Sequence, residues 1–140
     1  SFDADGDLDI AMTNRNAGAA LLRNTLGTSD TSRSLSLTLT DEEGVHGFQG
    51  AEIRVFEPGT ERVLASRLVD TGGGYVSQNL APVHIGLGST QRVDIVVTWP
   101  DGRSRRTWRF DDIDVPATST KPMVLELGVS LASAGDNVAN

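Results

Sequence analysis

Four aspartates alternate along the first nine residues of the chain and surround one glycine, in the run SFDADGDLDI. Carboxylates this close repel one another, and a bound divalent cation would hold them in one loop. Calcium takes six to eight oxygen ligands at about 2.3–2.6 Å, and oxygen-bearing side chains on alternate residues can all turn toward one ion. Gly6 permits the sharp turn of such a loop. The spacing predicts a Ca²⁺ site formed by Ser1, Asp3, Asp5, Asp7 and Asp9.

In this site Asp3, Asp5 and Asp9 would bind the ion through their carboxylates and Asp7 through its backbone carbonyl. The loop is not an EF-hand, because Met12 stands where a bidentate glutamate is needed and DLDIAMTN alternates like a strand instead of a helix. Ser1 stands where an aspartate is expected, so an acidic, solvated turn without an ion remains the alternative.

The composition bounds the possible partners. The chain has 140 residues, 38% of them hydrophobic, and a formal net charge of −7, which suits one soluble globular domain or one domain and part of another. An acidic chain without a long Lys/Arg patch argues against nucleic acid and anionic membranes as partners. The absence of cysteine excludes disulfides and thiolate metal sites in this sequence. Because the first residue is not Met, we expect a longer protein with any targeting signal upstream.

The distribution of apolar residues favours strands over helices. Apolar and polar residues alternate around 8–13, 35–40, 52–55 and 123–127, and turn-forming runs lie at 57–60, 71–74 and 100–102. Many short strands separated by turns are typical of a β-sandwich or barrel. The expected fold is therefore all-β.

Residues 93–110 predict a β-hairpin with the two-residue turn Asp101-Gly102. This register places the apolar and aromatic side chains on one side and pairs Asp94 with Arg109 on the other. It also predicts that both tryptophans are buried and that Arg106 must extend to water or find a partner. The expected cross-strand pairs are Val93 with Phe110, Ile95 with Trp108, Val97 with Arg106, Trp99 with Ser104 and Pro100 with Arg103.

The first 25 residues resemble the end of an FG-GAP or VCBS repeat. Such repeats combine a D-x-D-x-D-G-x-x-D loop with short strands and a closing Leu-hydrophobic-Arg-Asn segment, which here is LLRN at 21–24. The resemblance implies a partial β-propeller blade with calcium in the loop, as in integrin-like propellers.

Residues from about 35 to 110 resemble the ASPIC/UnbV domain, which follows such repeats in cartilage acidic protein-like proteins. The resemblance rests on the combination of GAEIRV, GGYVSQ, VHIGLG, VD and WPDG, and it departs from the family at residues 45–51. It implies an antiparallel β-sandwich in an exported protein. It names no reaction.

The remaining reactive side chains form no catalytic constellation. His84 lies in a strand-like run and is expected to be structural, and His46 to be solvated. Ser66 and Ser77 lack a nucleophile motif. Tyr75 is expected to be half-buried with a paired hydroxyl, the alternative being stacking on a sugar.

The final hairpin carries four arginines, whose expected role is a charged face that blunts pairing at the sheet edge. The alternative is a small contact with an anionic partner. These residues are Arg103, Arg105, Arg106 and Arg109.

Together these observations predict a non-enzymatic, calcium-binding extracellular module for protein binding or assembly. The alternative is a carbohydrate-binding module, which would need an exposed tryptophan. The expected organisation is a repeat end at 1–27, a linker at 28–34, a sandwich at 35–129 and a flexible tail at 130–140. The expected partners are upstream propeller repeats of the same protein or another copy of the chain, and a secreted, periplasmic or cell-surface location is expected.

Overall fold

The computed structural model describes residues 7–14, 16–25, 33–72, 78, 80–102, 104–117 and 121–129. These residues form strands and no helix, which confirms the all-β prediction, so no described helix could cross a membrane. The strands are β1 (Ile10–Asn14), β2 (Ala17–Leu22), β3 (Arg33–Thr40), β4 (Glu52–Phe56), β5 (Val63–Leu68), β6 (Val83–Gly88), β7 (Arg92–Asp101), β8 (Ser104–Asp114) and β9 (Met123–Glu126).

Several predictions fall outside the described residues. They concern Ser1, Asp3, Asp5, Tyr75, Ser77, Arg103, most of the predicted linker and the predicted tail. β3 begins at Arg33, which lies within the predicted linker range 28–34.

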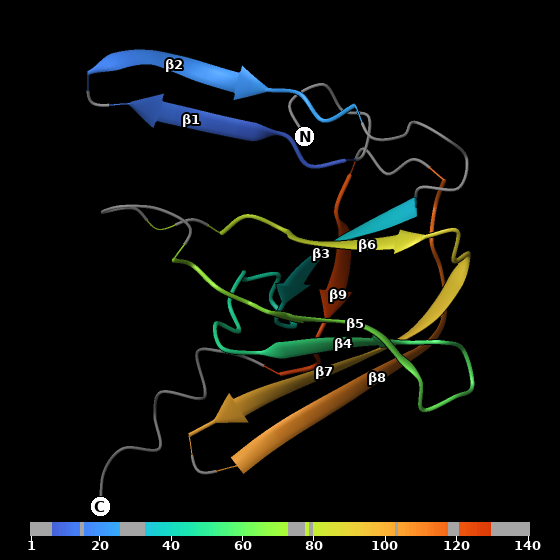
Figure 1. The fold of residues 1–140 in the computed structure, drawn as a ribbon. Helices are drawn as coiled ribbons and strands as arrows, with labels where there is room; N and C mark the ends of the chain where they lie inside the picture. The colour runs from blue at the N-terminus through green and yellow to red at the C-terminus, as the bar shows by residue number, and fades with distance from the viewer. Residues whose placement is uncertain are drawn as a thin grey trace, which may run out of the picture.

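β1 and β2 form an antiparallel hairpin that lies apart from the other strands (Figure 1). Ile10 pairs with Leu22 and Met12 with Ala20. Among the described strands, β1 and β2 contact only each other. The alternation predicted for residues 8–13 therefore does form a strand, but it buries neither of its faces.

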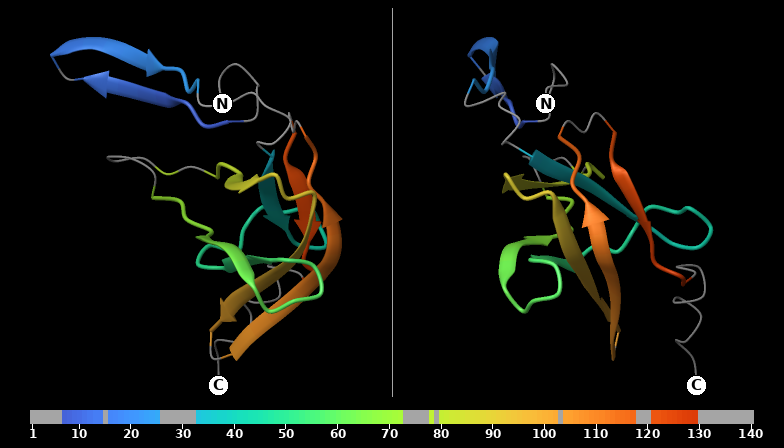
Figure 2. Two further views of the ribbon diagram at one scale, coloured as in Figure 1. Left: turned by 45° about the vertical axis from the view of Figure 1, so that its right-hand side comes forward. Right: turned by 90° about the vertical axis from the view of Figure 1, so that its right-hand side faces the viewer.

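Two sheets form the main body of the molecule (Figure 2). One has the order β6-β3-β9 and the other β5-β4-β7-β8. All ladders are antiparallel except β3–β9, in which Leu37 pairs with Met123 and Leu39 with Leu125. β9 follows β8, which belongs to the other sheet, so the chain crosses between the sheets before β9 pairs with β3. A parallel pair needs such a crossover, because a hairpin joins only antiparallel strands.

The core lies between the two sheets and follows the predicted alternation. Leu35, Leu37 and Leu39 of β3 point inward between the polar residues of the same strand. They meet Ile53 and Val55 of β4, together with buried side chains from the remaining strands and connections: Phe48, Ala51, Ile85, Leu87, Val93, Ile95, Val97, Val115, Leu125 and Leu127.

The β7–β8 hairpin exists, but its predicted register is wrong by two positions. Asp101 pairs with Ser104, so the turn begins at Gly102, which has a φ of +56°. A two-residue hairpin loop needs a positive φ at its first position, which glycine adopts without the steric cost that Asp101 would bear. Because the shift is even, the described side chains of the hairpin keep their predicted faces.

The corrected register changes the neighbours on the core side. Ile95 pairs with Phe110, Val97 with Trp108, and Trp99 with Arg106. A bulge then places Val93 opposite Ile113. Arg106 finds its partner in Asp101, with Nε 2.7 Å from Oδ2.

Candidate functional site

The described part of the predicted calcium loop lies at the base of the β1–β2 hairpin. Asp9 directly precedes β1, and its Oδ1 accepts a hydrogen bond of 2.9 Å from the backbone N–H of Asn24. Asn24 belongs to the predicted closing segment LLRN, so this bond ties the end of the loop to the chain just after β2. Asp7, like Asp9, is partly exposed.

The other predicted ligands, Ser1, Asp3 and Asp5, lie outside the described residues. Within the described ranges, acidic and histidine side chains form no group of three or more that could hold a metal ion. Asp7 and Asp9 are the predicted ligands that the structure describes, and the calcium site remains a prediction.

The hairpin beside this loop is apolar and exposed. Leu8, Ile10, Met12, Leu21 and Leu22 are each between 49% and 64% exposed. The β1–β2 register places Ile10 beside Leu22, so apolar side chains from both strands share one face. A two-stranded hairpin is at best marginally stable in water, so this hairpin gains stability if another element covers it.

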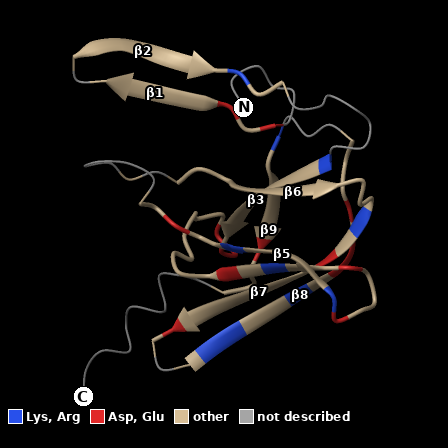
Figure 3. Ribbon diagram, in the orientation of Figure 1, with Lys and Arg blue, Asp and Glu red and all other residues tan. Residues whose placement is uncertain are grey.

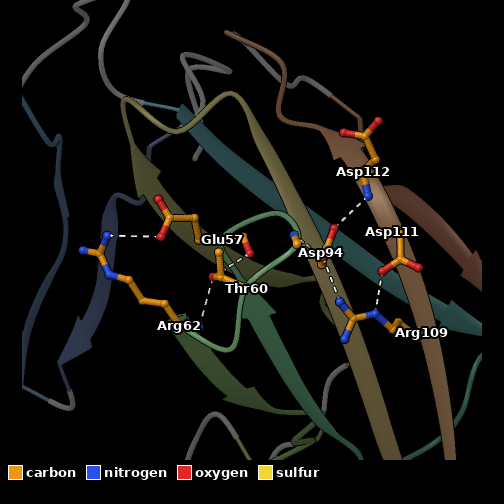
Figure 4. A network of polar contacts seen from close by, with 8 residues as sticks. Glu57, Thr60, Arg62, Asp94, Arg109, Asp111 and Asp112 are labelled. Atoms are coloured by element: carbon orange, nitrogen blue, oxygen red, sulfur yellow. Dashed lines mark hydrogen bonds and ion pairs between the residues drawn. The ribbon is translucent and has the colours of Figure 1, made fainter.

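A buried carboxylate joins three elements at the opposite end of the four-stranded sheet from the β7–β8 turn (Figure 4). Asp94 lies in the β7 bulge with its side chain 4% exposed. Its Oδ2 accepts hydrogen bonds from the Gly59 backbone N–H at 3.0 Å and from Arg109 Nη2 at 2.8 Å. Its Oδ1 accepts one from the Asp112 backbone N–H at 2.9 Å.

The predicted Asp94–Arg109 pair is thus confirmed as an ion pair, although Val96 is the cross-strand neighbour of Arg109. The backbone N–H groups of Asp112 and then Gly59 lower the pKa of Asp94 most, Arg109 lowers it further, and desolvation opposes them. Asp111 receives a 2.5 Å hydrogen bond from Arg109 Nε and is the main cause of the raised pKa of that guanidinium. Asp94 and Arg109 are therefore both charged at neutral pH, and the bonds of Asp94 fix the β4–β5 turn against β8.

The sequence did not reveal the two backbone donors of Asp94. Asp112 has a φ of +59°, a left-handed conformation that asparagine and aspartate adopt more readily than most residues, and it aims its N–H at Asp94. The sequence features that contain these two donors are the turn EPGT at 57–60 and the pair of aspartates at 111–112, near the end of β8.

A second buried carboxylate, Asp41, organises the loop after β3. Asp41 is 1% exposed, and its Oδ1 accepts backbone hydrogen bonds from Glu43 at 2.9 Å and Val45 at 2.7 Å. Such a local side-chain-to-backbone pattern fixes a turn. The loop leads to Phe48, which is 1% exposed and has a φ of +65°.

Phe48 packs against both tryptophans. Its ring centroid lies 5.1 Å from that of Trp99 and 6.1 Å from that of Trp108, in both cases edge to face. The sequence predicted that both tryptophans are buried, and the structure shows each of them half-buried. Both rings are engaged by Phe48, which favours a structural role over the sugar-stacking alternative.

The match to a protein family lies within this two-sheet body. The sequence profile of the ASPIC and UnbV family matches residues 43–115, more than half of the chain. The chain belongs to the ASPIC and UnbV family. This match covers the ASPIC/UnbV part of the resemblance, and the FG-GAP or VCBS part stays a prediction.

Three relatives of this ASPIC and UnbV chain are cartilage acidic protein 1 from different vertebrates. The Homo sapiens protein is 27% identical over 117 residues, which cover 73% of this chain and 15% of that protein. The Mus musculus and Xenopus tropicalis proteins are 28% and 26% identical, each with 16% of its length covered. The chain thus spans about one sixth of the length of these relatives, and no solved structure matches it significantly.

The ASPIC and UnbV match runs from the Asp41 loop through β8 and includes Phe48, both tryptophans and the Asp94 cluster. Inside it, His84 is half-buried on β6 opposite Ser36, and His46 is exposed. Ser66 Oγ donates a 3.2 Å hydrogen bond to Glu52. The hairpin, β3 and β9 lie outside the matched range.

Proposed function

We propose that this chain is a non-enzymatic extracellular module for protein binding or assembly, stabilised by Ca²⁺ at its N-terminal loop. The single observation that carries the calcium site is the bond between Asp9 and the Asn24 N–H, which closes the loop against the segment that ends the hairpin. The alternating aspartates supply the carboxylate and carbonyl oxygens that Ca²⁺ needs as ligands.

In this proposal Ser1, Asp3, Asp5 and Asp9 bind the ion through side-chain oxygens and Asp7 binds it through its carbonyl. The ion would offset the repulsion between the carboxylates and so fix the base of the β1–β2 hairpin. A fixed hairpin would then present its exposed apolar face, which includes Ile10, Met12 and Leu22, to another element.

The proposed partner of this face is a neighbouring strand from upstream propeller repeats of the same protein or from another copy of the chain. Both hairpin edges carry backbone groups that can pair with an added strand. The relatives are named as an acidic protein of cartilage, which supports an extracellular location for a chain that is itself acidic.

A thermal melt in calcium and in chelator tests the ion. Calcium at 100 times its Kd would stabilise the folded chain by about 2.7 kcal/mol. The double variant Asp5→Asn, Asp9→Asn should lose this response, and a matched control, Glu61→Gln with Asp114→Asn, should keep it because both residues lie outside the loop. An unchanged calcium response in the loop variant would refute the site.

A further inference from the structure

The outer face of the four-stranded sheet carries an open groove of about 380 Å³. Arg67 and Leu68 line it on the β5 side, and Pro100 and Arg105 line it on the β7–β8 side. Glu52 and Thr98, which pair across β4 and β7, lie between them. The groove therefore crosses the strands near the β7–β8 turn, away from the Asp94 cluster.

The groove carries excess positive charge. Glu52 already accepts a 2.9 Å ion pair from Arg54 Nε and a hydrogen bond from Ser66, and Arg54 is the main cause of its lowered pKa. Arg105 is exposed and makes no ion pair with any described residue, although its charge helps to lower the pKa of Glu52. Arg67 pairs with Ile53 across β4 and β5, so its side chain starts on the core side of the sheet, and it bonds through Nη1 to the Ser66 carbonyl. Figure 3 shows arginine positions on β4 and at the start of β8, on a chain whose net charge is −7.

The same groove has an apolar floor suited to a side chain. Leu68 is 60% exposed and Pro100 is exposed at the other end. None of the described residues that line the groove is aromatic. Sugars usually stack on aromatic rings, whereas an extended peptide can place apolar and charged side chains alternately, so the lining favours a peptide.

We propose that this groove binds an extended acidic peptide segment of a partner protein. A carboxylate of the peptide pairs with Arg105, whose guanidinium holds such a group in a planar, bidentate geometry. An apolar residue of the peptide lies on Leu68 and Pro100. The proposal rests on the binding role proposed above but not on calcium, because every groove residue belongs to the two-sheet body.

Fluorescence anisotropy of the full 140-residue chain tests the groove. The probe is a fluorescein-labelled octapeptide of four Glu, two Leu and two Gly, and its counterpart has Lys in place of Glu. We expect binding of the acidic peptide alone, weakened by salt. Arg105→Glu should weaken it by about fivefold to tenfold at low salt, because it replaces an attractive charge by a repulsive one.

The matched control is Arg62→Glu, which changes the net charge equally. Arg62 has a side chain 72% exposed and pairs with Glu57 in the β4–β5 turn. In the amide NMR spectrum the peptide should shift Gly50 and Thr98, which line the groove.

Several results would overturn the proposal. They are no binding of the acidic peptide, equal binding of the lysine peptide, equal weakening by both arginine variants, or displacement of the peptide by a neutral oligosaccharide. Binding of the acidic peptide that disappears in chelator would also overturn the groove, because it would show that the peptide binds at the calcium loop. Binding that persists while the calcium melt fails would support the groove and refute only the calcium site.

Discussion

Phe48 combines complete burial with a backbone conformation that L-residues avoid, and its replacement separates the two effects. Phe48 is 1% exposed and meets Trp99 and Trp108 edge to face. Phe48→Ala should lower the free energy of unfolding by about 3–5 kcal/mol, as for other buried phenylalanines that leave a cavity. Phe48→Leu should cost about 1–3 kcal/mol, because it loses two aromatic contacts of about 0.5–1.5 kcal/mol each and keeps most of the volume.

The φ of +65° makes a further variant informative. Phenylalanine and alanine carry the same Cβ penalty in the left-handed region, about 1–2 kcal/mol, so this strain cancels in the Ala variant. Glycine has no such penalty, although its freer unfolded chain costs about 0.4–1 kcal/mol. Phe48→Gly should therefore be at least as stable as Phe48→Ala, the reverse of their usual order in regular structure.

Urea denaturation followed by tryptophan fluorescence measures all three variants. Trp99 and Trp108 are the only tryptophans of the chain, so the signal reports on this cluster alone. In the folded Ala variant the emission should shift to the red and acrylamide should quench it more strongly. A Gly variant clearly less stable than the Ala variant would refute the role of backbone strain, and a loss below about 1 kcal/mol for Phe48→Ala would refute the packing argument.

Two further predictions concern the β7–β8 region. The pKa of Asp94 is lower in the folded chain than its ordinary value of 3.8, so the carboxylate stabilises the folded state at any pH above 3.8. This contribution is lost as the pH falls through the lower pKa of the folded state. Asp94→Asn should therefore lower the stability at neutral pH and flatten the fall in stability with acid in melts from pH 7 to pH 2, whereas an acid profile parallel to that of the unchanged chain would contradict this. Gly102→Ala should cost about 1–2 kcal/mol in urea denaturation because the φ is +56° with nothing within 4 Å of the added Cβ. Gly86→Ala, with the same open space and no positive φ, should be neutral or slightly stabilising, and equal effects at the two glycines would contradict the argument.

The alternation of side chains predicted strand positions and faces well, because the period of two is a local property. The leucines of β3 and the branched residues of β4 point into the core as expected. The register of β7–β8 was missed because it depends on which single residue takes the positive φ, and Gly102 takes it instead of Asp101. β2 and β5 were not predicted from the sequence. β2 begins with four small residues, and β5 lies at the edge of its sheet with mostly exposed side chains, so neither strand alternates clearly between apolar and polar residues.

The polar interior was harder to predict than the apolar one. A carboxylate is buried only if donors reach it, and the donors of Asp94 come from residues 35 positions before it and up to 18 after it. The sequence showed the Arg109 charge pair but not those backbone groups. The candidate calcium loop was visible in full because all of its proposed ligands lie within nine consecutive residues.

The parallel pair between β3 and β9 has a consequence for how the chain folds during synthesis. β3 lies at the centre of its sheet, yet β9, one of its two neighbours, is the last of the described strands. Leu37 therefore pairs with Met123 only after the intervening chain has been made. This long separation in sequence raises the contact order and slows folding. Until then the emerging chain exposes an open strand edge beside buried leucines, so the nascent domain would depend on chaperones or on its neighbours until β9 leaves the ribosome.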